Sequence, residues 1–270
     1  MNARPIQTIT LITDFGLQDG HVGAMKGVIR SIAPHVEIVD ISHYIEPQDI
    51  RHGGFVLMTA YPYWPPDTIH VIVVDPGVGT RRRAIAVQTP RGTFIAPDNG
   101  VLSYVLAHQE MTQAVQLTNP DYWHHPASPV FHGRDIFAPT AAYLALGTHI
   151  RELGQVIQPD ALVILPVPQP KRHPDGQITA HIQHIDRFGN CTTDLPGTWL
   201  EDAPHWQIEV QGQQFAQVHQ TFGQVPLGNP VLLVDSTGFL CVAVRNGNAA
   251  QTLDLQIGTL VRLWPKQEPT

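Results

Sequence analysis

A carboxylate, a glycine-rich turn and three arginines follow one apolar run near the middle of the chain. Residues 70–74, His-Val-Ile-Val-Val, are too few for a helix and are rich in β-branched side chains, which predicts a buried strand. Asp75 and a proline end this strand, and two glycines and three arginines at 81–83 follow. Open α/β sheets bind ligands at the carboxyl ends of their strands. A solvated Asp-Pro-Gly turn explains the same residues equally well, so both interpretations stay open here.

Carboxylates also follow an earlier predicted strand. Residues 6–12 alternate between polar and apolar types, and Asp14 and Asp19 lie in the loop that follows them. A further polar loop contains His132 and precedes apolar residues at helical spacing. Acidic strand ends of this kind indicate an enzyme-like chain without identifying its substrate.

Two loops in the last third of the chain carry groups suited to a polar ring. Residues 186–190, Asp-Arg-Phe-Gly-Asn, offer an aromatic face and an amide, which can stack on and hydrogen-bond a heteroaromatic ring. Residues 235–238, Asp-Ser-Thr-Gly, form the second loop, and a short polar segment at 245–248 follows one strand later. Hairpin turns contain the same residue types, so the residues alone favour plain turns.

Strand and helix patterns alternate through the first 164 residues. This order predicts a layered α/β domain whose largely parallel sheet is covered on both faces. We expect strands at 6–12, 36–41, 70–74 and 114–117, a hairpin at 84–96, and helices at 22–31, 49–61, 101–107 and from about 136 to 146.

A proline-rich segment at 165–176 separates this domain from a second one. Its four prolines predict a stiff, extended linker. Residues 177–270 show short strand patterns without a long helical one, which predicts an all-β, barrel-like domain. The expected strands of this domain are 178–185, 206–210, 231–234, 239–244 and 260–263.

Composition excludes several classes of function. The net charge of -7 argues against a general nucleic-acid binder. No apolar run approaches the length of a membrane span, and the first residues lack the apolar core of a signal peptide, so we expect a cytoplasmic protein without membrane attachment. The two cysteines form no CxxC pair and no HExxH occurs, so no metal site is expected.

Seven segments, taken in order, resemble the SAM hydroxide adenosyltransferases, which are adenosine-forming S-adenosyl-L-methionine (SAM) hydrolases. The fluorinating and chlorinating SAM enzymes are relatives of this family. The matching segments span nearly the whole chain: ITDFGLQDGHVGAMKG, DISHYIEPQDIRHGGFVL, VVDPGVGTRRR, APDNGVLSYV, HGRDIFAP, DRFGN and DSTGFLCVAVRNG.

The resemblance implies an α/β domain followed by a β-barrel, in a homotrimer whose active sites lie between subunits. It implies attack of water on C5′ of SAM, giving adenosine and L-methionine without a cofactor. By motif position, Asp75, Arg82 and His132 match the residues that handle the water. A carboxylate can accept a proton from water, whereas Arg and His can orient the water and stabilise hydroxide.

The substrate-binding positions are also implied by the resemblance. Asp14 matches the carboxylate that binds the ribose hydroxyls. The remaining matches are Asp19 and His21 at the methionine end, Asp186 at the ammonium group, Ser236 at the methionine, and Phe188, Asn190 and the backbone around Gly247 at the adenine.

Three positions depart from the halogenating pattern, and two alternative functions compete with hydrolysis. The fluorinating enzymes have an aromatic residue at Gln48, an arginine at Thr237 and a tyrosine at Asp75. A SAM-dependent halogenase is disfavoured because a carboxylate at Asp75 would repel a halide. A SAM-binding sensor with negligible turnover is disfavoured because binding alone needs no set of Asp75, Arg82 and His132.

Overall fold

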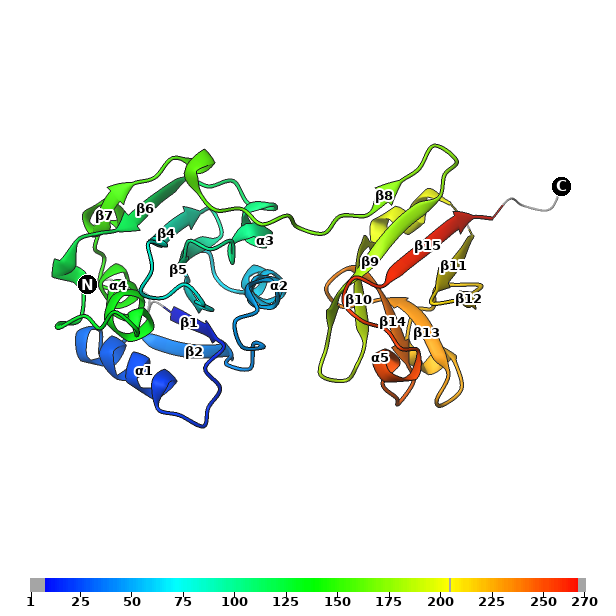
Figure 1. The fold of residues 1–270 in the computed structure, drawn as a ribbon, viewed down its shortest axis with the longest axis horizontal. Helices are drawn as coiled ribbons and strands as arrows, with labels where there is room; N and C mark the ends of the chain where they lie inside the picture. The colour runs from blue at the N-terminus through cyan, green and yellow to red at the C-terminus, as the bar shows by residue number, and fades with distance from the viewer. Residues whose placement is uncertain (1–7, 204, 267–270) are drawn as a thin grey trace, which may run out of the picture. The chain divides into compact units, whose positions relative to one another are not determined.

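The computed structural model describes residues 8–203 and 205–266. The chain divides into two compact units, Met1–Val167 and Pro168–Thr270 (Figure 1). Each unit has its own apolar core.

A seven-stranded sheet forms the centre of the first unit, in the order β2-β1-β3-β5-β4-β6-β7. The strands β2, β1, β3 and β5 pair in parallel. Because β4 is antiparallel to both β5 and β6, β6 runs in the same direction as β5. The predicted largely parallel sheet is therefore confirmed. The strands are β1 (Thr8–Thr13), β2 (Glu37–Ser42), β3 (Ile69–Val73), β4 (Ala84–Thr89), β5 (Gly92–Pro97), β6 (Gln113–Leu117) and β7 (Gly154–Val156).

Helices cover both faces of this sheet. On one face Ile9 and Leu11 of β1 pack in the same apolar cluster as Met25 of α1 and Ala141 of α4. The other face carries α2 and α3, and Figure 1 shows α1 and α4 lying together, apart from α2. Successive strand residues point to opposite faces, which explains why these strands read as continuous apolar runs. The helices are α1 (His21–Ile32), α2 (Ile50–Ala60), α3 (Ser103–Leu106) and α4 (Ala138–Ala145).

Two predicted helices differ in extent from the observed ones. The pattern at 101–107 forms only the single turn of α3, since Asn99 Oδ1 accepts the N–H of Val101 and holds the preceding residues in a turn. The last predicted helix begins with a π-helical turn, Gly133–Phe137, which leads directly into α4. His132 is the residue that precedes this turn.

The second unit is an antiparallel sheet that curls into a nearly closed barrel, as predicted. Its strand order is β12-β11-β15-β9-β10-β14-β13, and an isolated bridge between His219 and Leu233 links the segment after β12 to β13. The strands are β8 (Lys171–Arg172), β9 (Ile178–Ile185), β10 (Cys191–Pro196), β11 (Trp206–Val210), β12 (Gln213–Phe215), β13 (Pro230–Val234), β14 (Phe239–Val244) and β15 (Leu260–Pro265), with one short helix, α5 (Ala249–Thr252).

Several strands of this unit were not predicted. β10 mixes Thr and Asp with apolar residues and ends in a proline, so it lacks the alternation of a half-exposed strand, although Cys191 to Leu195 are all buried. β8 lies within residues 165–176, where we expected an extended linker, and pairs with β9.

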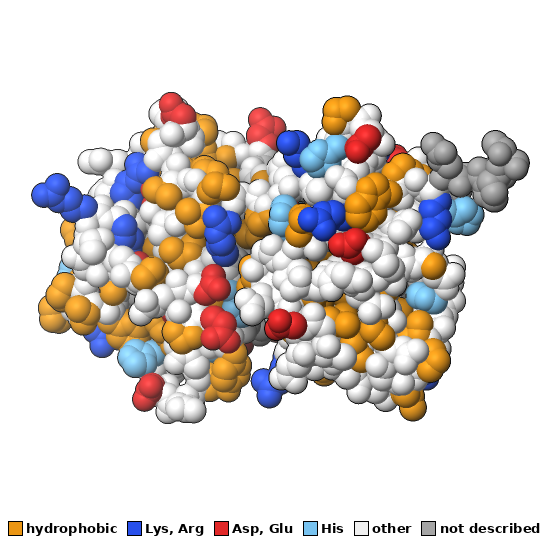
Figure 2. Space-filling view, turned by 45° about the vertical axis from the view of Figure 1, so that its right-hand side comes forward, with side chains coloured by type: hydrophobic (Ala, Val, Ile, Leu, Met, Phe, Trp, Pro, Cys, Tyr) orange, Lys and Arg blue, Asp and Glu red, His pale blue; other side chains and the backbone are white. Residues whose placement is uncertain are grey.

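Among the described residues, no helix has both the length and the apolar character needed to cross a membrane. On the face in view in Figure 2, the described Lys and Arg side chains are scattered among acidic and uncharged ones.

Candidate active site

Two carboxylates lie at the same edge of the first sheet. Asp14 follows β1 and Asp75 lies two residues after the end of β3, and these strands are parallel neighbours in the register Ile12 to Ile72. Parallel strands bring their carboxyl ends together, so both carboxylates reach one pocket of about 610 Å³. The pocket is lined by Asp14, Phe15, His21, Pro47, Gln48, Val73, Asp75, Pro76, Val78, Ser128, Val130, Phe131, His132, Gly133 and Arg134.

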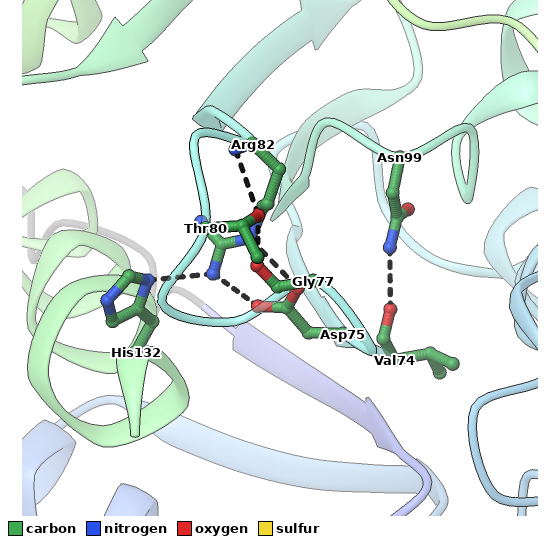
Figure 3. Close-up of polar contacts among 7 residues, drawn as sticks. All are labelled: Val74, Asp75, Gly77, Thr80, Arg82, Asn99 and His132. Carbon is green, nitrogen blue, oxygen red and sulfur yellow. Dashed lines mark hydrogen bonds and ion pairs between the residues drawn. The ribbon is translucent and has the colours of Figure 1, made fainter. Parts of the chain in front are cut away.

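Asp75, Arg82 and His132 form one connected set of side chains (Figure 3). Arg82 donates from Nε to Asp75 Oδ1 over 2.8 Å and from Nη2 to Asp75 Oδ2. The same Nη2 lies 2.7 Å from Nδ1 of His132. Arg82 is not among the lining residues, but it binds two of them. The structure thus brings the three predicted catalytic residues together; their chemical roles stay a prediction.

The loop between Asp75 and Arg82 turns back tightly. Thr80 Oγ1 donates to the carbonyl of Gly77 over 2.7 Å and accepts the N–H of Arg82 over 3.3 Å (Figure 3). Gly79 has φ +78, and a Cβ there would lie 2.8 Å from the carbonyl oxygen of Pro129. Glycine is therefore required both by the backbone conformation and by the close approach of the neighbouring loop.

His132 is held in its neutral form. A guanidinium only donates hydrogen bonds, so Nδ1 of His132 must be the acceptor of the bond from Arg82. Burial lowers the pKa of His132 and the charge of Arg82 lowers it further, whereas the carboxylates of Asp75 and Asp135 act in the opposite direction. Its pKa therefore lies below the ordinary value of 6.5.

The three consecutive arginines have different surroundings. Arg82 has a side chain only 9% exposed and is paired with Asp75, whose side chain is 5% exposed. Arg83 binds Asp98 from Nε over 2.8 Å and also donates to the carbonyl of Ala161. Arg81 is exposed. Arg82 is the arginine of this run that meets Asp75 and His132.

Asp14 is fixed by the segment before α2. Its Oδ2 accepts the N–H of Gln48 over 2.8 Å, and Gln48 adopts a positive φ of 67. A non-glycine residue with this φ is uncommon, and such strain clusters at functional sites. Gln48 itself lines the pocket.

The predicted methionine-end residues of the first unit differ in position. His21 lines the pocket, and its ring lies 5.2 Å from that of Phe131 and 5.5 Å from that of Phe15. Asp19 is exposed and is not among the lining residues.

In the second unit, the 186–190 loop and the segment containing Gly247 lie side by side. Asp186 accepts three hydrogen bonds of 2.8 Å within its own loop, from Phe188 N, Asn190 N and Asn190 Nδ2. The carbonyl of Gly189 accepts the N–H of Ala250 over 3.0 Å. Phe188 remains 74% exposed, so its ring is available for stacking.

Ser236 lies in a separate turn, between β13 and β14. It is exposed beside Asp235, which accepts Thr237 N over 2.8 Å and Thr192 Oγ1 over 2.7 Å. The structure therefore places the predicted residues of the second unit on two turns, 186–190 and 235–238, and on the Gly247 segment.

Sequence reasoning missed Asp135, which is fully buried under the pocket. Its carboxylate accepts Arg134 Nε over 2.6 Å and the N–H of Ser128 over 2.8 Å. It thereby connects the turn that follows His132 to Ser128, in the preceding segment of the pocket lining. The available signal was an acid beside an arginine at the start of an apolar helical pattern.

Among the described residues, no group of three or more His, Cys, Asp or Glu side chains is arranged to hold a metal ion.

An α/β domain that carries this pocket, followed by an antiparallel barrel, defines the architecture of the chain. The N-terminal domain of the SAM hydroxide adenosyltransferases matches residues 9–154, and their C-terminal domain matches residues 180–262. The chain belongs to the SAM hydroxide adenosyltransferase family.

Individual relatives agree with this assignment. The (R)-S-adenosyl-L-methionine hydrolase of Salinispora tropica is 43% identical over 96% of this chain and 98% of its own length. The enzyme of the same name from Thermus thermophilus is 38% identical over 96% and 100%, and a fluorinase from Actinoplanes sp. is 26% identical over 96% and 97%. The crystal structure of an uncharacterized conserved protein from Thermotoga maritima superposes with a TM-score of 0.88 at 34% identity, covering 94% of this chain and 99% of that one.

Proposed function

We propose that this chain hydrolyses S-adenosyl-L-methionine to adenosine and L-methionine. The observation that carries the proposal is the connected set of Asp75, Arg82 and His132 in the pocket that also contains Asp14. The full-length similarity to (R)-S-adenosyl-L-methionine hydrolases supports it.

In the proposed reaction, a water oxygen forms a bond to C5′ of the ribose while the bond between C5′ and sulfur breaks. The electron pair of that bond stays on sulfur, which converts the sulfonium into the neutral thioether of methionine. Because a sulfonium is already a good leaving group, the step needs neither a general acid nor a metal. The protein must supply a positioned, deprotonated water.

Asp75 has two candidate roles in that step. In the first, the Asp75 carboxylate accepts the water proton. In the second, the water loses its proton to bulk solvent, Arg82 and His132 stabilise the hydroxide that remains, and Asp75 fixes their geometry. Arg82 already donates to both oxygens of Asp75, which supports the second role, whereas the position of Asp75 in the pocket lining supports the first.

Substrate recognition divides between the two units. In this proposal Asp14 binds the ribose hydroxyls, with Asp19 and His21 at the methionine end. The second unit supplies the adenine site from Phe188, Asn190 and the backbone around Gly247, while Asp186 and Ser236 contact the methionine.

We further propose a cytoplasmic homotrimer whose active sites are shared between subunits. The division of the binding residues between two compact units supports shared sites, and the free, buried thiols of Cys191 and Cys241 fit a reducing compartment. Mixing an inactive Asp14 variant with an inactive Asn190 variant, under conditions of subunit exchange, should restore activity. A fully active monomer in light scattering would refute the assembly.

Product analysis tests the reaction itself. Purified protein incubated with SAM should release adenosine and methionine in equal amounts, at a rate that a chelator leaves unchanged. 5′-Chloro-5′-deoxyadenosine as the main product in chloride buffer would instead identify a halogenase, whose charged nucleophile the carboxylate of Asp75 disfavours. Tight SAM binding without products would identify a sensor.

A further inference from the structure

A buried histidine holds the Asp14 loop at two points. His43 is only 3% exposed, and its Nδ1 lies 2.8 Å from Oγ1 of Thr13, the residue before Asp14. Its backbone carbonyl accepts the N–H of Gly16 over 2.8 Å. His43 therefore contacts the loop on both sides of Asp14.

The hydrogen bonds around His43 have a defined direction. Thr13 is completely buried, and its Oγ1 accepts the N–H of Phe15 over 3.2 Å, so the hydroxyl proton needs an acceptor. Nδ1 of His43 lies in position to accept it. A neutral imidazole that accepts on Nδ1 carries its own proton on Nε2, which here lies 3.0 Å from Oδ1 of Asp40.

Asp40 completes this chain of contacts as an ionised acceptor. Its Oδ2 is 2.5 Å from Nζ of Lys26. Partial burial raises the pKa of Asp40, but its contacts with Lys26 and His43 outweigh this effect and bring the pKa below its usual value. The carboxylate thus stays charged and fixes the orientation of the His43 ring.

We propose that the chain Lys26–Asp40–His43–Thr13 sets the position of the Asp14 carboxylate, so that Thr13 and His43 are positioning residues for the substrate ribose. The inference rests on the proposed function, in which Asp14 binds the ribose hydroxyls. Each residue beside Asp14 is tied to this chain: Thr13 and Gly16 bind His43, and Phe15 binds Thr13.

The order Asp40, His43, Thr13 resembles a nucleophilic triad, but Thr13 has no exposed surface at which a substrate could be attacked. Nor does folding alone require a buried polar chain, because well-packed apolar residues often stabilise a core as well. This chain of contacts ends at Thr13, directly before Asp14. Its role is therefore to hold the geometry of the pocket.

The same strand provides a matched control. Thr10 lies three residues earlier on β1, is equally buried, and pairs through Oγ1 with Nδ1 of buried His70 over 2.7 Å. Neither Thr10 nor His70 lines the pocket. Thr10→Val and Thr13→Val therefore remove the same kind of hydrogen bond from the same strand, and only the second touches the Asp14 loop.

Steady-state kinetics with SAM on the full-length protein test the inference. Thr13→Val removes one hydrogen bond of ordinary strength, and this loss should raise KM about 3- to 10-fold. kcat should change by less than about twofold, because Asp14 contacts the ribose alike in the ground and transition states. Thr13→Ser, which keeps the hydroxyl, should restore KM, and Thr10→Val should lower the melting temperature while KM stays unchanged.

Two results would overturn the inference: an unchanged KM in Thr13→Val, or an equal rise of KM in Thr10→Val. Amide hydrogen exchange gives a second readout that is independent of turnover. Thr13→Val should accelerate exchange at Phe15 and Gly16, and Thr10→Val should not. If the wild-type protein does not hydrolyse SAM, the proposed function fails, and the exchange rates still decide whether this chain holds the Asp14 loop.

Discussion

Replacing Asp75 by asparagine tests the proposed chemistry most directly. The substitution keeps the size and shape of the side chain but removes its charge. It also places an amide donor where Oδ1 or Oδ2 now accepts an N–H of Arg82. The resulting contact between two donors should turn the guanidinium away, and with it the bond from Arg82 Nη2 to His132.

Asp75→Asn should lower both the rate of the reaction and the free energy of unfolding. A positioned general base contributes about 10²- to 10⁴-fold to the rate, which is about 3 to 5 kcal/mol of activation free energy. Arg82 and Asp75 have side chains only 9% and 5% exposed, so the guanidinium would lose its counter-charge in a poorly solvated site. Removing one partner of a buried pair costs about 3 kcal/mol or more of unfolding free energy.

Asp98→Asn separates the loss of stability from the loss of chemistry. Asp98 pairs with the neighbouring Arg83, has a side chain 2% exposed, and does not line the pocket. Both variants should unfold at lower urea concentration than the wild type, but only Asp75→Asn should lose turnover.

Single-turnover rates and titration calorimetry with SAM provide the assay. We expect Asp75→Asn to bind SAM with near wild-type affinity and to turn it over at least about 100-fold more slowly. Normal turnover in this variant would reduce Asp75 to a turn residue. An equal loss of turnover in Asp98→Asn would show that general destabilisation, and not chemistry, was being measured.

Three further outcomes follow from the geometry. kcat/KM should be constant near pH 7 and fall only below pH 6.5, as His132 becomes protonated and can no longer accept the bond from Arg82; a profile that falls already above pH 7 would contradict this. Burial lowers the pKa of His70 from 6.5 to about 4. Between pH 6.5 and about pH 4, the unfolded state therefore binds more protons than the folded state. Unfolding free energy should therefore drop by about 3 kcal/mol as pH falls through this window, less so in His70→Gln, as urea titrations at several pH values would measure. Asp186→Asn should raise the Kd for SAM by about 10-fold or more in calorimetry without changing the single-turnover rate, because the carboxylate organises the turn that carries Phe188.

Much of the fold was predictable from local patterns. The strand at 70–74 and the hairpin at 84–96 correspond closely to β3 and to the β4–β5 pair, because β-branched runs and turn residues act over a few positions. β10 was missed because its residues from Cys191 to Leu195 are all buried, the polar ones included; Thr193, for example, donates from Oγ1 to the carbonyl of Leu240. Burial of that kind leaves no alternation in the sequence.

The types of the site residues were readable from the sequence, and their arrangement was not. Asp14 and Asp75 stand out because each follows an apolar strand, and the parallel sheet brings such strand ends together. The sequence does not distinguish the adjacent residues Arg82 and Arg83, yet Arg82 pairs with Asp75 and Arg83 with Asp98. His132 is 50 residues from Arg82, and His43 is 30 residues from Thr13. Local chemistry determines turns, strands and the availability of charged groups, whereas contacts over such distances exist only once the order of strands in the sheet and the packing of loops over its edge have been decided.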